Sequence, residues 1–269
     1  MLATSLLRCP LCRQPLEQRG GSLFCPKGHC HDIARQGYVN LAPKAKGNFY
    51  KKELFESRAK VFEAGVFAPV VEAISEALCT YVPGECPVIL DAGCGEGYYL
   101  RSVCPDRQMT RIGFDIAKEA VQLAAKAAKD ASFFVGDLAA IPVLDGCCDA
   151  VLDVFTPANY GEFARVLKPG GVLIKLAPRA NYLCQLRKAA GDQLRHQEYD
   201  GGRVERYAQQ HMQMKEQRAI TYTVPVDPDL AFHLARMTPM LAGVDLSAVD
   251  LSGVTEITID ETLYVGTMA

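Results

Sequence analysis

The segment from residue 87 to residue 178 alternates short apolar stretches with amphipathic ones, and this pattern restricts the fold more than any other feature of the chain. The apolar stretches predict five strands, at 87–92, 110–116, 131–138, 148–155 and 170–178. The stretches between them predict three helices, at 98–104, 117–130 and 160–167. Strands that alternate with helices form a parallel sheet covered on both faces. The expected fold class is therefore α/β.

The segments before residue 87 and after residue 178 predict further helices and strands. Apolar residues at helical spacing predict two helices between Glu53 and Tyr81, separated at Gly65. Residues 180–218 are polar and favour helix. The final segments predict a strand at 219–226, a helix that includes HLARMTPML, and strands over 254–268 that complete the sheet.

Composition limits where the protein works. The chain has 269 residues, 49% of them hydrophobic, with a mean hydropathy of +0.02. No apolar run approaches the roughly 18 residues of a membrane span. The N-terminus lacks the charged lead-in of a signal peptide. We therefore expect a cytoplasmic protein with no membrane partner.

A glycine-rich turn follows the first predicted strand, in the sequence LDAGCGEGY. It differs from the dinucleotide fingerprint G-x-G-x-x-G because Tyr98 occupies the position of the third glycine. Asp91 precedes the turn and would repel a pyrophosphate but attract an amino group or a sulfonium. The backbone can approach such a ligand closely at three glycines, Gly93, Gly95 and Gly97. The turn therefore favours S-adenosylmethionine over a nicotinamide dinucleotide.

Two further acids follow the second and third strands. Asp115, ahead of Ile116, is placed where a carboxylate accepts hydrogen bonds from both hydroxyl groups of a ribose. Asp137 can accept from an adenine amino group, while the backbone N–H of Leu138 donates to the ring. Each acid alone has a second interpretation, as a helix N-cap or a turn residue. Three acids at consecutive strand ends beside a glycine turn favour the cofactor site.

Cysteine and histidine residues are concentrated near the N-terminus. Two pairs with twelve residues between them have zinc-finger spacing, Cys9-x2-Cys12 and Cys25-x3-His29. Cys30 and His31 compete with His29 for the fourth position. Residues 1–40 hold too few apolar side chains to fold without a bound metal ion. The alternative, reduced cysteines without metal, would leave this unit almost no core. We expect a structural zinc site with no open position.

Charge is distributed unevenly along the chain, although the net charge is −2. Residues 1–60 hold 11 of the 29 Lys and Arg residues but 4 of the 31 Asp and Glu residues. A basic module on an acidic body suggests that a polyanion, if one binds, contacts the N-terminal part. The expected phosphate contacts are Arg35, Lys44, Lys46, Lys51 and Lys52. The alternative is an ordinary solvated surface.

Several segments together resemble the RlmA-type 23S ribosomal RNA guanine-N1 methyltransferases. The similarity runs from about residue 9 to the end and is weakest between 185 and 225. The segments that carry it are CPLCRQPL, FCPKGHCHDIARQGYVNL, RAKVFEAGVF, ILDAGCGEGYY, FARVLKPGG and LARMTPM. FARVLKPGG also resembles the helix–turn–strand after the fourth strand of class I methyltransferases.

The resemblance implies a class I, Rossmann-like methyltransferase that uses S-adenosylmethionine and carries a zinc ribbon that contacts RNA. The expected parts are the ribbon at 1–41, a linker and helices at 42–84, and the methyltransferase domain at 85–269. The implied product is N1-methylguanosine in a hairpin loop of 23S rRNA. Carried over by position, the zinc ligands are Cys9, Cys12, Cys25 and His29. The cofactor contacts carried over are Phe67, Gly95, Glu96 and Tyr182.

The chain departs from the family pattern at two places. Phe67 and Tyr182 stand where a tyrosine and a histidine are expected, although both rings can still pack or stack. LDVFTPANY follows the fourth strand, where the family typically has a sequence like FAPC. Asp153 in this segment is the candidate base for the N1 proton of guanine, with a structural carboxylate as the alternative. Phe155 and Tyr160 are candidates to stack on an extruded base, or to pack in the core.

Two other functions are alternatives to RNA methylation. A small-molecule methyltransferase with a structural zinc ribbon would not need the basic segment 35–60. A non-catalytic RNA-binding assembly factor would not need the glycine turn and its acids. The sequence leaves the target nucleotide and the oligomeric state open, with a homodimer as one alternative.

Overall fold

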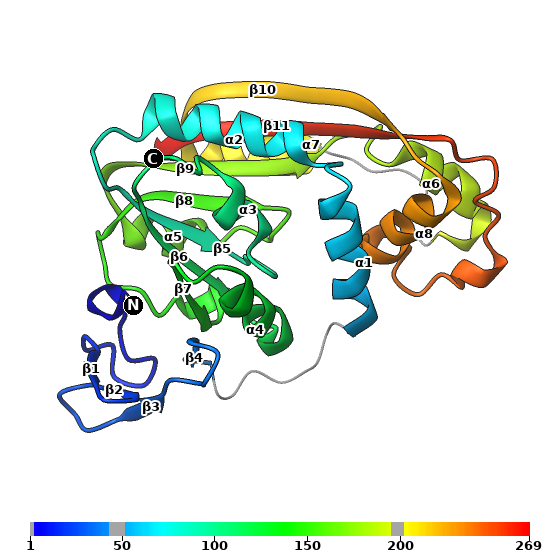
Figure 1. Ribbon diagram of the computed structural model, residues 1–269. Helices are drawn as coiled ribbons and strands as arrows, with labels where there is room; N and C mark the ends of the chain where they lie inside the picture. Colours follow the sequence, from blue (N-terminus) through cyan, green and yellow to red (C-terminus); the bar gives the residue numbers. More distant parts are fainter. Residues whose placement is uncertain (1–2, 43–51, 195–201) are drawn as a thin grey trace.

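The computed structural model describes residues 3–42, 52–194 and 202–269. A small antiparallel sheet near the N-terminus has the order β1-β2-β3, with β1 at Glu17–Arg19, β2 at Ser22–Phe24 and β3 at Cys30–Asp32 (Figure 1). A second sheet has the order β10-β11-β9-β8-β5-β6-β7-β4. Its strands are β4 (Val39–Asn40), β5 (Val88–Ala92), β6 (Thr110–Asp115), β7 (Ala131–Val135), β8 (Cys148–Val154), β9 (Leu167–Pro178), β10 (Met212–Pro225) and β11 (Glu256–Met268).

The α-helices are α1 (Lys52–Glu63), α2 (Ala68–Tyr81), α3 (Tyr98–Ser102), α4 (Lys118–Ala127), α5 (Tyr160–Val166), α6 (Cys184–Ala190), α7 (Gly202–His211) and α8 (Pro228–Met237). Short 3₁₀ helices are η1 (Thr4–Leu6), η2 (Leu138–Ala140), η3 (Gly191–Gln193), η4 (Pro239–Leu241) and η5 (Leu246–Ala248).

The five predicted parallel strands are confirmed, and their order places a crevice beside the glycine turn. β5 pairs with β6 on one side and with β8 on the other, all parallel. The strand order therefore reverses at β5, and open α/β sheets bind ligands outside the carboxyl ends of strands at such a switch point. β11 then pairs antiparallel with both β9 and β10. This is the α/β class expected from the sequence.

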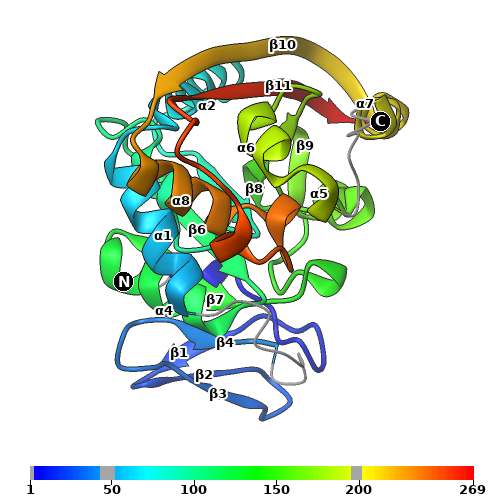
Figure 2. The same cartoon turned by 90° about the vertical axis from the view of Figure 1, so that its right-hand side faces the viewer.

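Helices cover both faces of the large sheet, because its strands are apolar on both sides. Ile89 of β5 packs in one core cluster with residues of α2, α3 and α4. Leu90, the next residue, packs in a second cluster with residues of α5, α7 and the ribbon. Burying one such side chain stabilises the fold by about 1.5–3 kcal/mol. Figures 1 and 2 show the ribbon next to β4 and β7, with β10 and β11 curving over the opposite end.

The ribbon contributes a strand to the large sheet. Val39 and Asn40 pair in parallel with Phe134 and Val135 of β7, so β4 is the edge strand. This pairing leaves the chain at the carboxyl edge of the sheet, where it enters the basic linker. Of the basic residues expected there, Lys44, Lys46 and Lys51 lie outside the described residues.

Two elements differ from the sequence-based expectation. Residues 212–218 were expected to favour helix, but they begin β10, which pairs with β11 from Met212 to Pro225. Pairing along a whole strand outweighs the weak helix propensity of these polar residues. The predicted helix through HLARMTPML ends at Met237, because the residue before Pro239 is disfavoured in the helical conformation. The break at Gly65 is confirmed, and this residue has a φ of 73°.

Among the helices of the described ranges, none is long and apolar enough to cross a membrane.

Candidate active site and metal centre

The four predicted zinc ligands lie together in the ribbon. The ligand atoms of Cys9, Cys12, Cys25 and His29 are all within 4.8 Å of one another. Sγ of Cys25 is 3.5 Å from Sγ of Cys12 and 3.3 Å from Nδ1 of His29. A tetrahedral zinc ion with bonds of about 2.0–2.3 Å separates its ligand atoms by roughly 3.5 Å, so this set fits the ion. With four ligands from the protein, the centre leaves no position for a substrate.

A tight turn brings Cys25 and His29 to the same point. The backbone N–H of Gly28 donates to the carbonyl of Cys25 at 2.9 Å, and Gly28 has a φ of 80°. Burial opposes ionisation of the Cys25 thiol, but hydrogen bonds from Cys12 and from backbone N–H groups lower its pKa to about 6. A thiolate, the form that binds zinc, is therefore available at neutral pH.

The neighbours of His29 occupy other positions. The thiol of Cys30 is exposed and lies 3.9 Å from the carboxylate of Asp32. His31 is buried, and its Nε2 lies 3.5 Å from Sγ of Cys9, but it is not among the four residues whose ligand atoms all lie within 4.8 Å of one another. This geometry favours His29 as the fourth ligand, with His31 supporting Cys9 from outside the set.

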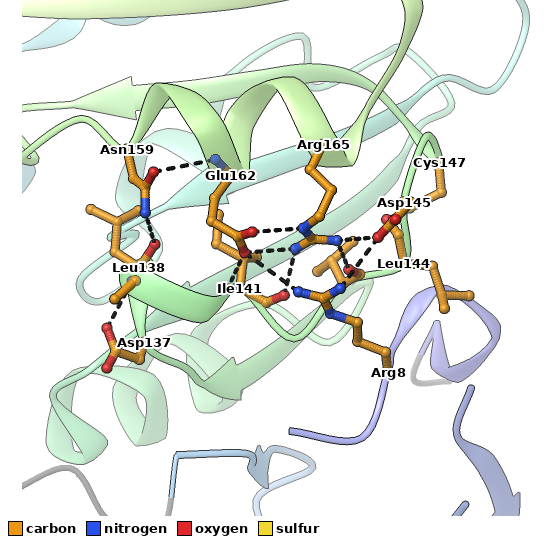
Figure 3. A network of polar contacts seen from close by, with 12 residues as sticks. Arg8, Asp137, Leu138, Ile141, Leu144, Asp145, Cys147, Asn159, Glu162 and Arg165 are labelled. Carbon is orange, nitrogen blue, oxygen red and sulfur yellow. Dashed lines mark hydrogen bonds and ion pairs between the residues drawn. The ribbon is translucent and has the colours of Figure 1, made fainter. Parts of the chain in front are cut away.

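A network of ion pairs fixes the ribbon on the large sheet (Figure 3). Arg8, next to Cys9, lies 3.3 Å from Asp145 and 3.6 Å from Glu162. Arg165 binds the same two acids at 2.6 and 2.7 Å. The Glu162 carboxylate also accepts from the backbone N–H of Ile141 at 2.6 Å. The metal centre is thereby held in a defined position relative to α5 and the loop after η2.

The glycine turn has the backbone that the sequence predicted. Gly93, Gly95 and Gly97 have φ values between 55° and 74°, in the left-handed region that favours glycine. A Cβ atom on Gly93 would lie 2.3 Å from Oγ1 of Thr156, so the turn has no room for a side chain there. Gly97 begins α3 as its N-cap. The turn therefore presents bare backbone at the carboxyl end of β5.

Asp91 is the buried acid of this turn. Its side chain is buried, and within the described residues its Oδ2 atom has no hydrogen-bond partner. Burial first, and then the charges of Asp115 and Asp153, raise the pKa of Asp91 to about 8. A buried carboxyl with one unpaired oxygen favours a cationic ligand, because a positive charge compensates its ionised form. The residues of this site fit the amino group or sulfonium of S-adenosylmethionine.

This pKa predicts that cofactor binding releases a proton. At pH 6.5 the Asp91 carboxyl of the free protein is mostly protonated, since its pKa is about 8. Contact with a cation lowers that pKa, so close to one proton should leave on binding. Calorimetry of S-adenosylmethionine binding in buffers of different ionisation enthalpy measures this number. A binding heat that does not depend on the buffer would contradict the prediction.

Asp115 is held at the end of β6, one strand away from Asp91. Its two carboxylate oxygens accept from the backbone N–H groups of Gly95, at 3.0 Å, and Ala117, at 2.8 Å. Each oxygen keeps a lone pair for a ribose hydroxyl. Ile116 is half-buried beside it. The contact to a ribose stays a prediction, and this geometry supports it.

Asp137 and Leu138 follow β7, and both are drawn with the polar contacts of Figure 3. Asp137 is exposed and caps η2, since its Oδ1 accepts from the backbone N–H of Ala139 at 2.8 Å. This contact agrees with the interpretation of Asp137 as a helix N-cap. A contact of the same residue with adenine stays a prediction. The carbonyl of Leu138 accepts from Asn159 at 2.9 Å, which ties this loop to the start of α5.

Aromatic rings from three separate segments meet beside the glycine turn. Phe67 precedes α2 and is buried, and its ring lies 6.4 Å from that of Phe155. Phe155 follows β8, has a left-handed φ of 56°, and lies 5.6 Å from Tyr182. The Phe155 side chain is 39% exposed. The structure therefore offers a half-exposed aromatic face at the carboxyl end of β8. Tyr160, in contrast, is buried and stacks on His211 at 4.6 Å.

Asp153, the candidate base, is fully buried. Its Oδ2 atom lies 2.8 Å from Nζ of Lys175, whose side chain is also buried. Burial raises the pKa of Asp153, and Lys175 opposes this shift. By the alternation of β8, Asp153 shares the face of Val151, which packs with α5, and not that of Leu152, which packs with α2 and α3. These observations favour a structural carboxylate.

We therefore expect Asp153→Asn to affect stability more than chemistry. The change leaves the Lys175 charge buried without its partner, which typically costs about 3–5 kcal/mol. Urea unfolding measures this loss, and Asp149→Asn is the matched control. Asp149 lies on the same strand and pairs with Lys168 at 2.8 Å, but that pair is partly exposed and should contribute about 0–1 kcal/mol. A folded D153N variant with methylation reduced about 100-fold would restore Asp153 as the base.

Sequence reasoning missed three charged residues of this region. Arg58 of α1 binds both carboxylate oxygens of Glu96 at 2.8 Å and lies over Gly95. Lys175 pairs with Asp153 as described. Glu261 of β11 is completely buried. Glu261 could have been found from the sequence. In ITIDETLYV successive residues face opposite sides of the strand, and Glu261 falls on the same side as Ile259 and Leu263.

Comparison with known proteins gives two family matches. Residues 7–47 match the family described as RlmA, N-terminal, and residues 89–171 match a methyltransferase domain. YxjB of Bacillus subtilis (strain 168), named as a candidate 23S rRNA (guanine-N1)-methyltransferase, is 35% identical over 97% of this chain and 97% of its own. The 23S rRNA (guanine(748)-N(1))-methyltransferase of Streptomyces fradiae is 31% identical over 96% of this chain and 95% of that protein.

A solved structure supports the fold. It is the complex between the Haloferax volcanii Trm112 methyltransferase activator and a candidate methyltransferase. The matched chain has a TM-score of 0.50 and 20% identity, over 81% of this chain and 98% of that one.

Proposed function

The chain belongs to the family of RlmA-type 23S rRNA (guanine-N1)-methyltransferases, and we propose that it methylates N1 of a guanosine in a hairpin loop of 23S rRNA. The observation that carries this proposal is that the ribbon with the metal centre is fixed to the sheet that holds the glycine turn. Arg8 fixes the ribbon on Asp145 and Glu162, and β4 of the ribbon extends the sheet. RNA bound by the ribbon would therefore be held at a fixed distance from the crevice.

The protein's contribution to the reaction is mainly positioning. S-adenosylmethionine, when bound, supplies a methyl group that its sulfonium makes electrophilic. Asp91 would hold the cationic part of this cofactor and Asp115 its ribose. A base taken out of an RNA loop can stack on the exposed face of Phe155, next to Tyr182. Holding both reactants in line lowers the barrier by several kcal/mol.

The RNA would approach from the ribbon and the linker. Arg35 is exposed on the ribbon, and α1 begins at Lys52 after the basic linker. Positive charge along this path supports binding to a phosphate backbone. A cytoplasmic location follows from a ribosomal RNA substrate. A homodimer stays a prediction that light scattering tests.

Methyl transfer to RNA in vitro tests the proposed function. The purified chain, S-adenosylmethionine with a labelled methyl group and a 23S rRNA transcript should yield 1-methylguanosine after digestion. Binding of the cofactor without any methylated nucleoside would favour the small-molecule alternative. Absence of cofactor binding in calorimetry would favour a non-catalytic assembly factor.

A further inference from the structure

Glu261 of β11 is a buried acid that none of the roles above uses. Its side chain has 0% exposure, and within the described part of the chain neither carboxylate oxygen has a hydrogen-bond partner. Unpartnered buried polar atoms are rare in native proteins, because they lose their contacts with water and gain none in return. Here both acceptors of one carboxylate are unpaired. Such a group is suited to a ligand that brings two donors.

Glu261 lies at the carboxyl end of the parallel strands, on the side of the sheet that faces the crevice. Glu261 lies opposite Pro178, the last residue of β9. By the alternation of β11 it shares the face of Ile259 and Leu263, which pack in the same cluster as Phe67. Asp260, one residue earlier, faces the other way and binds Arg179 at 2.8 Å. Glu261 therefore lies on the same side of the sheet as the cofactor residues, whereas Asp153 does not.

Its surroundings connect it to the aromatic site for the base. Burial, and next the charge of Glu261, raise the pKa of both Tyr99 and Tyr182, so both phenols lie near this carboxyl. The same two causes raise the pKa of Tyr222, whose hydroxyl donates to the carbonyl of Val66 beside Phe67. Tyr182 in turn contacts Phe155. Glu261 thus lies near Tyr182, which is in contact with the ring on which a base would stack.

The Watson–Crick edge of guanine presents two neighbouring donors, N1–H and the N2 amino group. A carboxylate offers two acceptors at matching separation. We propose that Glu261 accepts hydrogen bonds from both groups of the target guanine and takes the N1 proton during methyl transfer. This inference rests on the proposed function. The N1–carbon bond forms, the carbon–sulfur bond breaks with its electron pair left on sulfur, and the N1 proton passes to a Glu261 carboxylate oxygen.

The electrostatics of the site agree with this role. Burial first, and then the charge of Asp260, raise the pKa of Glu261 well above its ordinary value. A higher pKa makes the ionised carboxylate a stronger base. The two N–H donors of a bound guanine favour that ionised form, because hydrogen bonds to a charged group stabilise its charge. The titratable groups identified around it are Tyr99, Tyr182, Tyr222 and Asp260.

Glu261→Gln tests the proposal, with Glu256→Gln as the matched control. Glu256 lies on the same strand but is exposed. The E261Q amide keeps the shape of the side chain but cannot take a proton. Its kcat for N1-methylguanosine formation should fall at least about 100-fold, while E256Q keeps the wild-type rate. Calorimetry should show unchanged S-adenosylmethionine binding for both variants. An E261Q rate within threefold of wild type would overturn the proposal.

A second measurement uses only the wild-type protein. Inosine at the target position lacks the N2 amino group and should lower kcat/KM at least about tenfold, since one hydrogen bond to a charged group is lost. Equal rates with guanosine and inosine would overturn bidentate recognition. E261Q should lose this preference for guanosine. A wild-type protein that forms no 1-methylguanosine would refute the proposed function and this inference together, whereas an active E261Q would refute only the inference.

Discussion

Replacing Cys25 by serine should abolish zinc binding and RNA binding while cofactor binding persists. Cys25 contacts both Cys12 and His29 in the four-ligand set, so its loss opens the centre. Binding of structural zinc is folding energy on the order of 10 kcal/mol, and loss of one ligand removes much of this energy from the ribbon. The glycine turn belongs to the large sheet, where β5 lies between β6 and β8. S-adenosylmethionine affinity should therefore change only a few-fold.

Cys30→Ser is the control for this experiment. Cys30 lies in the same segment, but its thiol is exposed and outside the ligand set. Elemental analysis should find one zinc per chain in wild type and C30S, and much less in C25S. RNA binding measured by filter retention should follow zinc content. A C25S variant that keeps full zinc would remove Cys25 from the ligand set.

Replacing Gly93 by alanine should reduce S-adenosylmethionine affinity by at least about 100-fold. The new Cβ would lie 2.3 Å from Oγ1 of Thr156 and 3.0 Å from its Cβ, so rotation of the Thr156 side chain cannot relieve the clash. The backbone of the turn or of the segment after β8 has to move, and both border the cofactor site. Inserting a methyl group where there is no room typically costs about 1–3 kcal/mol, and a cost near the upper end corresponds to about 100-fold in affinity.

Gly170→Ala separates the clash from backbone strain. Gly170 has a φ of 78°, close to the 74° of Gly93, but no atom lies within 4 Å of its added Cβ. Both variants carry alanine in the left-handed region, so both lose some stability. Only G93A should lose cofactor affinity in calorimetry. Equal affinities in G93A and G170A would show that the close approach at Gly93 is not needed for binding.

The sequence predicted the framework of the site because the framework is local. The glycine spacing around Gly93 and the Cys9-x2-Cys12 pair are set by neighbouring residues, and the structure brings these groups together as expected. The five parallel strands also follow from local apolar runs. What sequence reasoning missed depends on pairing between distant segments. β10 begins at Met212 because residues 212–218 pair with β11, although their propensity alone favours helix.

The roles of Asp153 and Glu261 also depend on pairing between distant segments, which the local sequence does not show. Asp153 lies near the end of the fourth predicted strand, where the sequence places the crevice. The alternation of β8 and the pairing with Lys175 instead place its side chain on the opposite face of the sheet. Glu261 is far from the glycine turn in sequence, and only the antiparallel pairing of β11 with β9 brings it to the carboxyl end of the sheet. Which side of the sheet a strand residue faces becomes clear when the neighbouring core residues are known.

Mapping of 23S rRNA by mass spectrometry, in cells with and without this protein, tests the central claim most directly. We expect one guanosine in a hairpin loop to lose an N1 methyl group when the protein is absent. The methyl group should return with the wild-type chain but not with G93A. An identical set of 23S rRNA modifications in both cells would contradict the assignment of this chain as a 23S rRNA guanine-N1 methyltransferase.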